Sequence, residues 1–330
     1  MTHASARQEF LAPRAAPGLL SLVIPIYNEE DGLPHLRQAL DVWRQKAGVP
    51  TEVVLVDDGS TDASLGFLRL WAAGDATVKV IAFSKNFGHQ IALTAGLEHA
   101  SGDAVVILDA DLQDPLEVIP AMLAKYCEGY DVVYGRRQDR LGEGLFKQAS
   151  AWLFYRLMRA LVYRDLPADT GDFRLVSRRC VNVLLSMPEG HRFLRGLFSW
   201  MGFPQAAVEY VRQPRRYGET KYPLRRMLRF AANAILSFSP LPIRLISAVG
   251  AGTAIFGFIY GFYVIGRWYW VGDAVAGWPT LVVLLCVIGG MILLSLGVVG
   301  EYVSRIYEAV KHRPLYIVRE SLNVASHNPH

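Results

Sequence analysis

An apolar run at residues 105–108 leads directly into a group of polar side chains. Asp109 and Asp111 are separated by one residue, and Gln113 follows after one more. Carboxylate and amide oxygens at this spacing suit a divalent cation such as Mg²⁺ or Mn²⁺, and such a cation usually holds a phosphate-bearing substrate. The motif is short, so an acidic turn after a strand is the alternative interpretation. The elements around the motif have to decide between the two.

Further apolar runs also end in polar residues. β-rich runs predict strands at 20–26, 52–56, 78–83, 104–108 and 131–134, and helical patterns lie at 31–46, after Gly88 and at 116–128. This alternation predicts an α/β domain with a parallel sheet covered on both faces. Right-handed crossovers then place the strand ends along one edge, so Tyr27, Asp58, Asn86 and Asp109 should converge on one cleft. The chain lacks the Gly-x-Gly-x-x-Gly and P-loop patterns, which argues against a dinucleotide site and a P-loop.

The region from 140 to 225 is mixed in pattern. A helix is expected at about 145–162, followed by a loop at 170–175 in which Asp172 and Arg174 lie side by side. Residues 208–212 predict an edge strand. The basic, glycine-containing stretch 215–222 includes Arg215 and Lys221 and is suited to clamping phosphates.

Composition points to anionic partners and a membrane. The chain has 330 residues, of which 52% are hydrophobic, and a net charge of +4. Basic residues cluster at 136–147, 212–229 and 305–319, which fits phosphates or lipid headgroups better than nucleic acid. The three cysteines are scattered and predict neither a disulfide framework nor a metal motif. No apolar stretch precedes residue 19, so we expect no signal peptide.

Two uncharged segments, 245–265 and 280–299, meet the length of about 20 residues needed to cross a bilayer. A buried core hairpin is the alternative. Before them, residues 224–238 are amphipathic and carry Arg225, Arg226 and Arg229, as in a helix lying on an anionic membrane surface. Aromatic residues at 268–270 and 278 would form a belt at the hairpin tip. Basic residues flank both spans on the side away from the tip, which predicts that both termini and the α/β domain are cytoplasmic.

The predicted organisation is therefore a disordered leader at 1–18 and an α/β domain at 19–223. An amphipathic juxtamembrane helix at 224–243, two transmembrane helices at 244–303 and a basic cytoplasmic tail at 304–330 follow.

Several motifs in this order resemble those of inverting family 2 glycosyltransferases with a GT-A (Rossmann-like) fold. The resemblance covers about residues 19–319, and the segments that carry it are Pro25-x-Tyr27-Asn28-Glu29, Asp57-Asp58-Gly59-Ser60-x-Asp62, Asn86-Phe87-Gly88, 109–115, 171–175 and 218–221. More narrowly, the chain looks like the polyprenyl-phosphate glycosyltransferases, which include dolichyl-phosphate mannose synthases. The two-span hairpin and the tail motif Arg313-Pro314-x-Tyr316 look most like the bactoprenol glucosyltransferase branch.

The resemblance implies roles at matching positions. A first set would hold the nucleotide base and ribose: Pro25, Tyr27, Glu29 and Asp58. A second set would bind Mg²⁺ or Mn²⁺: Asp109, Asp111 and Gln113. A third set would meet donor or acceptor phosphates: Arg136, Arg174, Arg215 and Lys221. Asp172 matches a proposed catalytic position, so Asp111, Asp172 and Arg174 are the expected catalytic residues.

Some of these residues also have simpler interpretations. Asp172 could form a loop salt bridge with Arg174, Asp58 could cap a helix, and Gln113 could be a turn amide. His89 and His191 could act as bases, but lone histidines are more often structural, and we expect neither to be catalytic.

The expected reaction is transfer of a hexose, with glucose from UDP-glucose as first choice, to undecaprenyl or another polyprenyl phosphate at the cytoplasmic membrane face. A nucleotide-diphosphate leaving group needs charge neutralisation more than a proton. The lipid phosphate is already anionic, so a strong general base is less necessary. The product would serve cell-envelope glycan modification, and the glycine-rich hairpins could pair in a homo-oligomer.

Other donors remain open at this stage: GDP-mannose, UDP-4-formamido-arabinose or a UDP-N-acetylhexosamine. A processive polysaccharide synthase is disfavoured because the chain has no Gln-x-x-Arg-Trp motif. A non-catalytic membrane scaffold is the more distant alternative, and the intact Asp109, Asp111 and Lys221 argue against it.

Overall fold

The computed structural model describes residues 11–137, 170–190, 192–211, 241–271 and 277–324. They belong to two units, one built around a β-sheet and one built from two long helices. The predicted helix at 145–162, residues 224–240 of the predicted amphipathic helix at 224–243, Arg215, Lys221 and His191 lie outside the described residues. Residues 241–243 begin the first long helix of the second unit.

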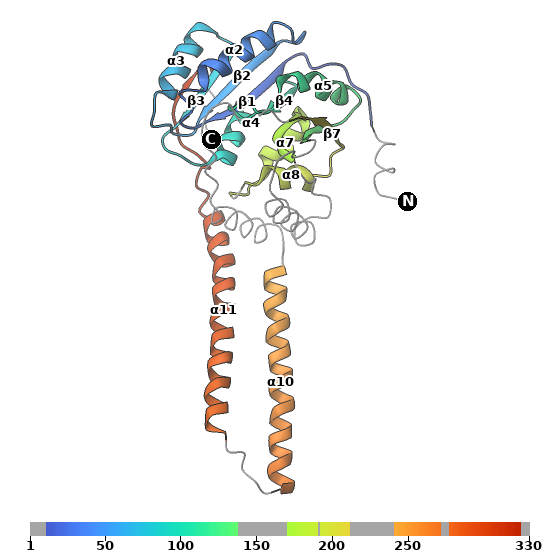
Figure 1. The fold of residues 1–330 in the computed structure, drawn as a ribbon, viewed down its shortest axis with the longest axis vertical. Helices are drawn as coiled ribbons and strands as arrows, with labels where there is room; N and C mark the ends of the chain where they lie inside the picture. The colour runs from blue at the N-terminus through green and yellow to red at the C-terminus, as the bar shows by residue number, and fades with distance from the viewer. Residues whose placement is uncertain (1–10, 138–169, 191, 212–240, 272–276, 325–330) are drawn as a thin grey trace. The chain divides into compact units, whose positions relative to one another are not determined.

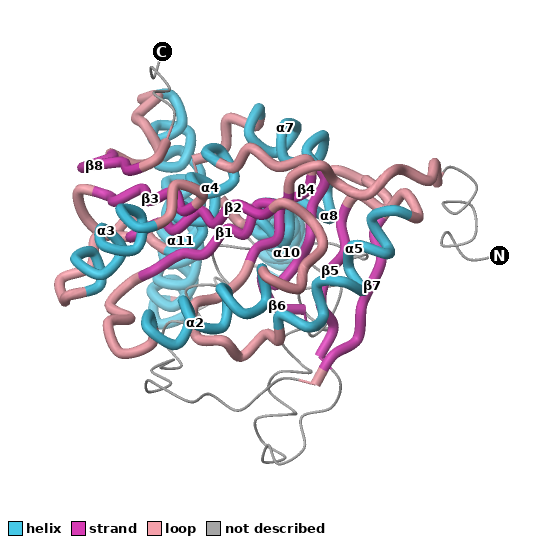
Figure 2. Tube along the Cα trace, turned by 90° about the horizontal axis from the view of Figure 1, so that it is seen from above, coloured by secondary structure: helices cyan, strands magenta, loops and turns pink. Residues whose placement is uncertain are grey.

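The sheet has eight strands in the order β7-β5-β6-β4-β1-β2-β3-β8 (Figures 1 and 2). Their bounds in chain order are β1 Leu20–Ile26, β2 Thr51–Asp57, β3 Val78–Phe83, β4 Ala104–Ile107, β5 Val132–Arg137, β6 Thr170–Ser177, β7 Gln205–Tyr210 and β8 Val318–Leu322. The neighbours β4, β1, β2 and β3 are parallel, as predicted, and their carboxyl ends share one edge. However, β6 runs antiparallel to β4 and β5, and β8 runs antiparallel to β3, so the sheet is mixed.

The prediction of a loop at 170–175 is wrong, because these residues lie in strand β6. Its residues alternate between the two faces of the sheet, and Phe173 and Leu175 join the hydrophobic core. The intervening Asp172 and Arg174 are buried on the opposite face. Two buried charges in an eight-residue strand conceal the period-two pattern from a reading of the sequence alone.

Helices cover both faces of the sheet (Figure 2). On one face, α2 Leu33–Arg44, α3 Ser64–Gly74 and α5 Ile119–Cys127 pack their apolar side chains against the core, with the short 3-10 helix η2 Leu116–Val118 leading into α5. On the other face lies α4 His89–His99, with α7 Arg178–Ser186 beside it. Helix α8 Leu194–Trp200 follows α7 in the chain. Helix α4 approaches the sheet so closely that a Cβ at Gly96 would overlap Val23 Cγ1.

Residues 11–18 do not behave as the predicted disordered leader. The Arg14 amide donates to the Cys127 carbonyl at 2.9 Å, and its guanidinium forms an ion pair with Asp131 at 3.2 Å. Asp131 is fully buried, so Arg14 helps to neutralise a charge at the start of β5.

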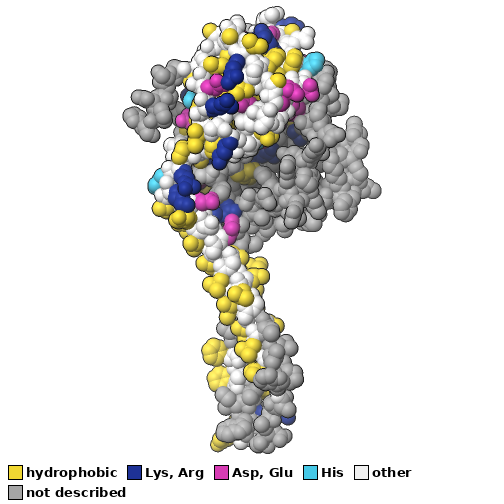
Figure 3. Space-filling model, turned by 90° about the vertical axis from the view of Figure 1, so that its left-hand side faces the viewer, with side chains coloured by type: hydrophobic (Ala, Val, Ile, Leu, Met, Phe, Trp, Pro, Cys, Tyr) yellow, Lys and Arg dark blue, Asp and Glu magenta, His cyan; other side chains and the backbone are white. Residues whose placement is uncertain are grey.

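The second unit consists of α10 Leu241–Val271 and α11 Trp278–Val310. Both helices extend beyond the predicted spans. Their segments Leu245–Tyr263 and Val287–Val310 are long and apolar enough to cross a membrane, each with a hydropathy of 1.7. Apolar side chains line the exposed surface of the long helix that faces the viewer in Figure 3. Leu293 and Leu294 on α11 are among the exposed apolar residues. The expected aromatic belt at 268–270 falls in the last turns of α10.

The predicted tail at 304–330 is divided differently in the structure. Residues 304–310 continue α11, and Val318–Leu322 forms the edge strand β8 of the sheet. Its sequence, Val-Arg-Glu-Ser-Leu, has too little apolar character to predict a strand.

Candidate active site

Hydrogen bonds join the loops that follow β1 and β2. The Asn28 amide donates to Ser60 Oγ at 3.0 Å, and Asn28 Oδ1 accepts from the Thr61 amide at 2.8 Å. The Glu29 amide donates to Ser64 Oγ at 3.0 Å. The Asn28 backbone has a φ of 53°, a left-handed conformation that asparagine tolerates better than most residues. These contacts confirm that the first two strand ends converge.

Asp58 joins the second strand end to the third. Its Oδ1 accepts from the Phe87 amide at 2.7 Å, and its Oδ2 accepts from the Gly88 amide at 3.0 Å. Burial raises the pKa of Asp58, and these two amides act against that rise. Asp58 therefore holds the β3–α4 loop. It does not cap α3, whose N-cap residue is Ala63, but it accepts from the amide of Gly88, the N-cap residue of α4.

Gly59 lets the β2 and β3 loops approach closely. Its φ is 70°, and a Cβ there would lie 2.6 Å from the Asn86 nitrogen and would overlap the Lys85 backbone. Only glycine fits both the conformation and the space. Nearby, the Tyr27 side chain is 47% exposed, as a ring that stacks on a ligand would be, whereas Pro25 is buried within β1.

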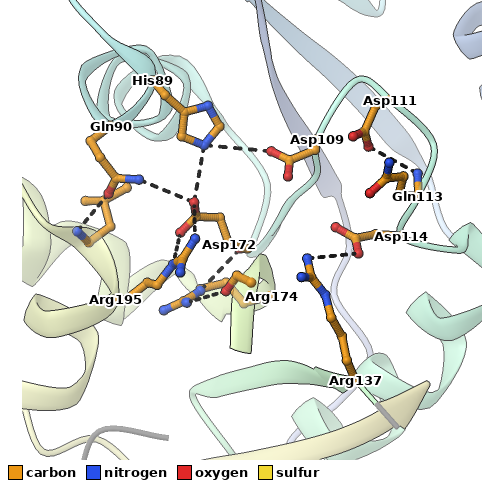
Figure 4. A network of polar contacts seen from close by, with 12 residues as sticks. His89, Gln90, Asp109, Asp111, Gln113, Asp114, Arg137, Asp172, Arg174 and Arg195 are labelled. Atoms are coloured by element: carbon orange, nitrogen blue, oxygen red, sulfur yellow. Dashed lines mark hydrogen bonds and ion pairs between the residues drawn. The ribbon is translucent and has the colours of Figure 1, made fainter. Parts of the chain in front are cut away.

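His89 joins the loop after β3 to two carboxylates (Figure 4). Its Nε2 lies 3.7 Å from Asp109 Oδ1 and 3.2 Å from Asp172 Oδ2. Burial lowers the pKa of His89, but the hydrogen bond with Asp172 and the charges of Asp109 and Asp172 outweigh it and raise the pKa overall. Burial also raises the pKa of Asp109, to about 6; His89 opposes that rise, and the charges of Asp172, Asp114 and Asp111 add to it.

This donor set fits a divalent cation. Asp109 and Asp111 could provide hard oxygen ligands. The pKa of Asp109 is raised first by burial and then by the charges of Asp172, Asp114 and Asp111, and a cation would neutralise the charge of this carboxylate cluster. Within the described ranges, no three His, Cys, Asp or Glu side chains already form a complete metal-binding group. The Gln113 backbone amide donates to Asp111 Oδ1 at 3.1 Å, and Leu112 has a φ of 53°. Gln113 therefore closes a turn around Asp111, and its side chain is buried.

Asp172 is held by Arg195 and not by Arg174 (Figure 4). Arg195 Nε donates to Oδ1 at 2.7 Å and Nη2 donates to Oδ2 at 2.9 Å, while Gln90 Nε2 donates to Oδ2 at 3.3 Å. Burial would raise the pKa of Asp172, but Arg195 and His89 outweigh it and hold that pKa well below its usual range. The carboxylate is therefore ionised, and both its oxygens have partners.

The alternative interpretation of Asp172, a loop salt bridge with Arg174, is not observed for this reason. Arg174 instead donates from Nη2 to the Gly171 carbonyl at 3.0 Å and from Nε to the Asp172 carbonyl at 3.3 Å. Its guanidinium also lies over the Phe198 ring, 5.0 Å from the centroid. Burial lowers the pKa of Arg174 to about 10, and the charge of Asp172 acts in the opposite direction. Arg174 is thus buried and connects β6 to α8 through these contacts.

At the end of β5, the arginine beside the carboxylates is Arg137. The predicted Arg136 is half-exposed and forms an ion pair with Glu209 on β7. Successive strand residues point to opposite faces, so Arg137 lies next to Asp114 at 4.0 Å and donates from Nε to the Tyr210 hydroxyl at 3.3 Å. The Tyr210 hydroxyl in turn donates to Asp114 Oδ1.

Three side chains of this network, Gln90, Arg137 and Arg195, were not predicted from the sequence, and His89 was expected to be structural. Only His89 had a signal, because it follows the Asn86-Phe87-Gly88 motif directly. Together the described groups form a carboxylate cluster beside arginines, at the edge of the mixed sheet where its central parallel strands have their carboxyl ends. Such an arrangement can hold a cation and the phosphates that accompany it.

Known proteins are similar in sequence to this chain over most of its length. Residues 21–185 match the family described as "Glycosyl transferase family 2". The chain is 45% identical to an uncharacterized glycosyltransferase, YkcC, of Bacillus subtilis, over 92% of this chain and 94% of the relative. It is 39% identical to an SfII prophage-derived bactoprenol glucosyl transferase of Shigella flexneri, over 92% and 98%. Among solved structures, a glucosyl-3-phosphoglycerate synthase from Mycobacterium tuberculosis is 22% identical, with a TM-score of 0.48 over 70% of this chain and 78% of that one.

Proposed function

Because the chain belongs to glycosyl transferase family 2 and has its GT-A fold, we propose that it transfers a hexose, glucose from UDP-glucose, to polyprenyl phosphate. The observation that carries this proposal is the convergence of Asp58, Asp109, Asp111 and His89 on one edge of the sheet. The acceptor is supported by relatives named bactoprenol glucosyl transferase that align over nearly their whole length. The two apolar helices supply the membrane attachment that a lipid acceptor requires.

On the donor side, Asp58 and the loop 84–88 would surround the nucleoside, and the exposed Tyr27 ring would stack on the base. The diphosphate would lie toward Asp109, Asp111 and Arg137. A divalent cation held by Asp109 and Asp111 would neutralise the charge that develops on the departing nucleoside diphosphate. Arg137, together with Arg215 and Lys221 from the sequence prediction, would add hydrogen bonds to the phosphates.

Transfer would proceed as a single displacement with inversion. An oxygen of the lipid phosphate forms a bond to the anomeric carbon, while the bond from that carbon to the diphosphate oxygen breaks. The nucleophile is an anion, so no side chain has to remove a proton from it. The ionised and fully engaged Asp172 therefore positions His89 and Arg195 in this proposal, and base catalysis is not assigned to it.

We place the sheet-bearing unit on the cytoplasmic side of the membrane, where nucleotide sugars are made. The support is the distribution of basic residues on the two sides of the apolar helices. Arg225, Arg226 and Arg229 would bind anionic headgroups and bring the lipid phosphate within reach of the carboxylates.

An Asp111→Ala variant tests the proposal. Purified full-length protein, a polyprenyl phosphate, Mg²⁺ or Mn²⁺ and labelled UDP-glucose are combined, and the label that extracts with lipid is counted. We expect Asp111→Ala to lose at least about 100-fold in rate, since electrostatic groups at such sites contribute several kcal/mol to lowering the barrier. Glu117→Ala, an exposed acid on the neighbouring 3-10 helix, is the control and should stay within about twofold. Full transfer by Asp111→Ala would count against the catalytic role of this cluster.

A further inference from the structure

The segment 314–323, which follows α11 in the chain, is bound to the sheet along its length; we call it the C-terminal strap. Strand β8 lies within it and pairs with β3. At its far end, the Asn323 side-chain amide donates to the Ala72 carbonyl at 2.8 Å and to the Val78 carbonyl at 2.9 Å. Glu320 forms an ion pair with Arg69 on α3 at 2.7 Å. The strap is thus an integral part of the sheet-bearing unit, and the site described above uses none of it.

Tyr316 lies where the strap meets the end of β3. Its ring stacks on Phe83, with centroids 4.8 Å apart and an angle of 24° between the planes. Its hydroxyl donates to Glu98 Oε2 at 2.7 Å, near the end of α4. The next strap residue, Ile317, accepts a hydrogen bond from the Ser84 amide at 2.9 Å. Tyr316 therefore contacts both the strand that precedes the loop 84–88 and the helix that follows it.

The loop 84–88 is the one that Asp58 holds. The Phe83 ring packs edge-on against the Phe87 ring, with centroids 5.6 Å apart. The Phe87 amide makes the shorter of the two hydrogen bonds that the loop donates to Asp58. One residue after the loop, His89 reaches Asp109 and Asp172. A continuous set of contacts therefore runs from Tyr316 through Phe83 and Phe87 to Asp58.

We infer that Tyr316 is a positioning residue of the donor site: by clamping β3 to α4, it keeps the loop 84–88 in the conformation that binds the nucleotide. The inference rests on the proposed function for the identity of the ligand. Without the ring, Phe83 loses a stacked partner, and the loop spends more time in conformations that release Asp58. Apparent affinity then falls in proportion to the binding-competent fraction. This also gives the motif Arg313-Pro314-x-Tyr316 a role beyond family resemblance.

Hydrogen exchange in the full-length protein without nucleotide tests the clamp directly. Tyr316→Ala should speed exchange of the amides at Phe87 and Gly88 by about tenfold, because an aromatic pair contributes on the order of one factor of ten. Tyr316→Phe keeps the stack and should restore most of the protection. Glu320→Gln breaks the ion pair with Arg69 elsewhere in the strap and should leave these two amides unchanged.

Binding of UDP with Mn²⁺, measured by calorimetry on the same variants, tests the functional part. We expect the Kd of Tyr316→Ala to rise about tenfold, with Tyr316→Phe within about threefold and Glu320→Gln within about twofold of the unsubstituted protein. The Michaelis constant for the lipid phosphate should not change.

Unaltered exchange at Phe87 and Gly88 in Tyr316→Ala overturns the inference, as does an unaltered Kd. If Tyr316→Ala does not fold, Phe83→Leu decides, because it removes the ring on which Tyr316 stacks: exchange at Phe87 and Gly88 and a Kd that both match the unsubstituted protein overturn the inference. If the unsubstituted protein binds no nucleotide, the donor assignment fails, while the exchange experiment still decides the clamp.

Discussion

The ion pair between Arg195 and Asp172 gives the sharpest prediction for a single side chain. Arg195→Met keeps most of the aliphatic volume and removes both hydrogen bonds to the carboxylate, which is 8% exposed. Asp172 then retains only His89 and Gln90 as described partners. Removing one partner of a fully buried pair costs about 3–5 kcal/mol.

Arg195 is 31% exposed, so solvent screens part of that interaction, and we expect a loss of about 2–3 kcal/mol. For a unit of this size that corresponds to about 4–12 °C in unfolding temperature. The pH dependence has a defined sign. The pKa of Asp172 is depressed in the folded protein, so its stabilisation is fully present above the ordinary value of 3.8 and is lost as pH falls through the folded pKa.

The assay is thermal unfolding of the full-length protein in detergent, followed by tyrosine and tryptophan fluorescence, from pH 3.5 to pH 8. Arg195→Met should unfold well below the unsubstituted protein at pH 7, and the difference should persist down to about pH 3.8 and only begin to narrow at the acid end. Arg37→Met is the matched control, because Arg37 pairs with Asp41 on the surface, where both side chains are more than 40% exposed. A shift for Arg195→Met no larger than that of Arg37→Met at pH 7 would refute the reasoning.

Three further substitutions test contacts that hold the sheet-bearing unit together. Gly59→Ala places a Cβ against the Lys85 backbone at a φ of 70°, so we expect about 1–3 kcal/mol of destabilisation in unfolding experiments and weaker UDP binding in calorimetry; Gly66→Ala, in open space on α3, should have neither effect. Gly96→Ala forces α4 away from Val23 and should lower the unfolding temperature by a similar amount, which circular dichroism would detect. Burial raises the pKa of Glu52, but hydrogen bonds from Lys79, Ser21 and Ser101 lower it overall, so Glu52→Gln should be less stable at pH 7 and lose that difference as pH falls below about 4.5. Equal unfolding temperatures for Glu52→Gln and the unsubstituted protein at pH 7 would contradict this.

The central strands could be predicted from the sequence because they are buried on both faces and therefore continuously apolar. Strands β1 and β3 have the bounds that their apolar runs predict. Parallel order then dictates that Asp58 and Asp109 meet at one edge, whichever residues lie between them in the chain.

The edge strands and the pairing of charged side chains in the site could not be predicted, because they depend on long-range contacts. Strand β6 places Asp172 and Arg174 on one face, and only the position of α8 determines that Arg195 takes the carboxylate. The choice between Arg136 and Arg137 depends on which face of β5 each residue occupies, and two adjacent arginines do not indicate this. Strand β8 is predominantly polar and is defined by its pairing with β3.

The most direct test of the account is a donor panel. Purified full-length protein is incubated with polyprenyl phosphate, Mg²⁺ or Mn²⁺ and each labelled nucleotide sugar in turn: UDP-glucose, GDP-mannose, a UDP-N-acetylhexosamine and UDP-4-formamido-arabinose. We expect lipid-extractable label from UDP-glucose that requires both polyprenyl phosphate and the divalent cation. Label from another donor would reassign the sugar, and absence of lipid-linked label from every donor would contradict the proposed transfer.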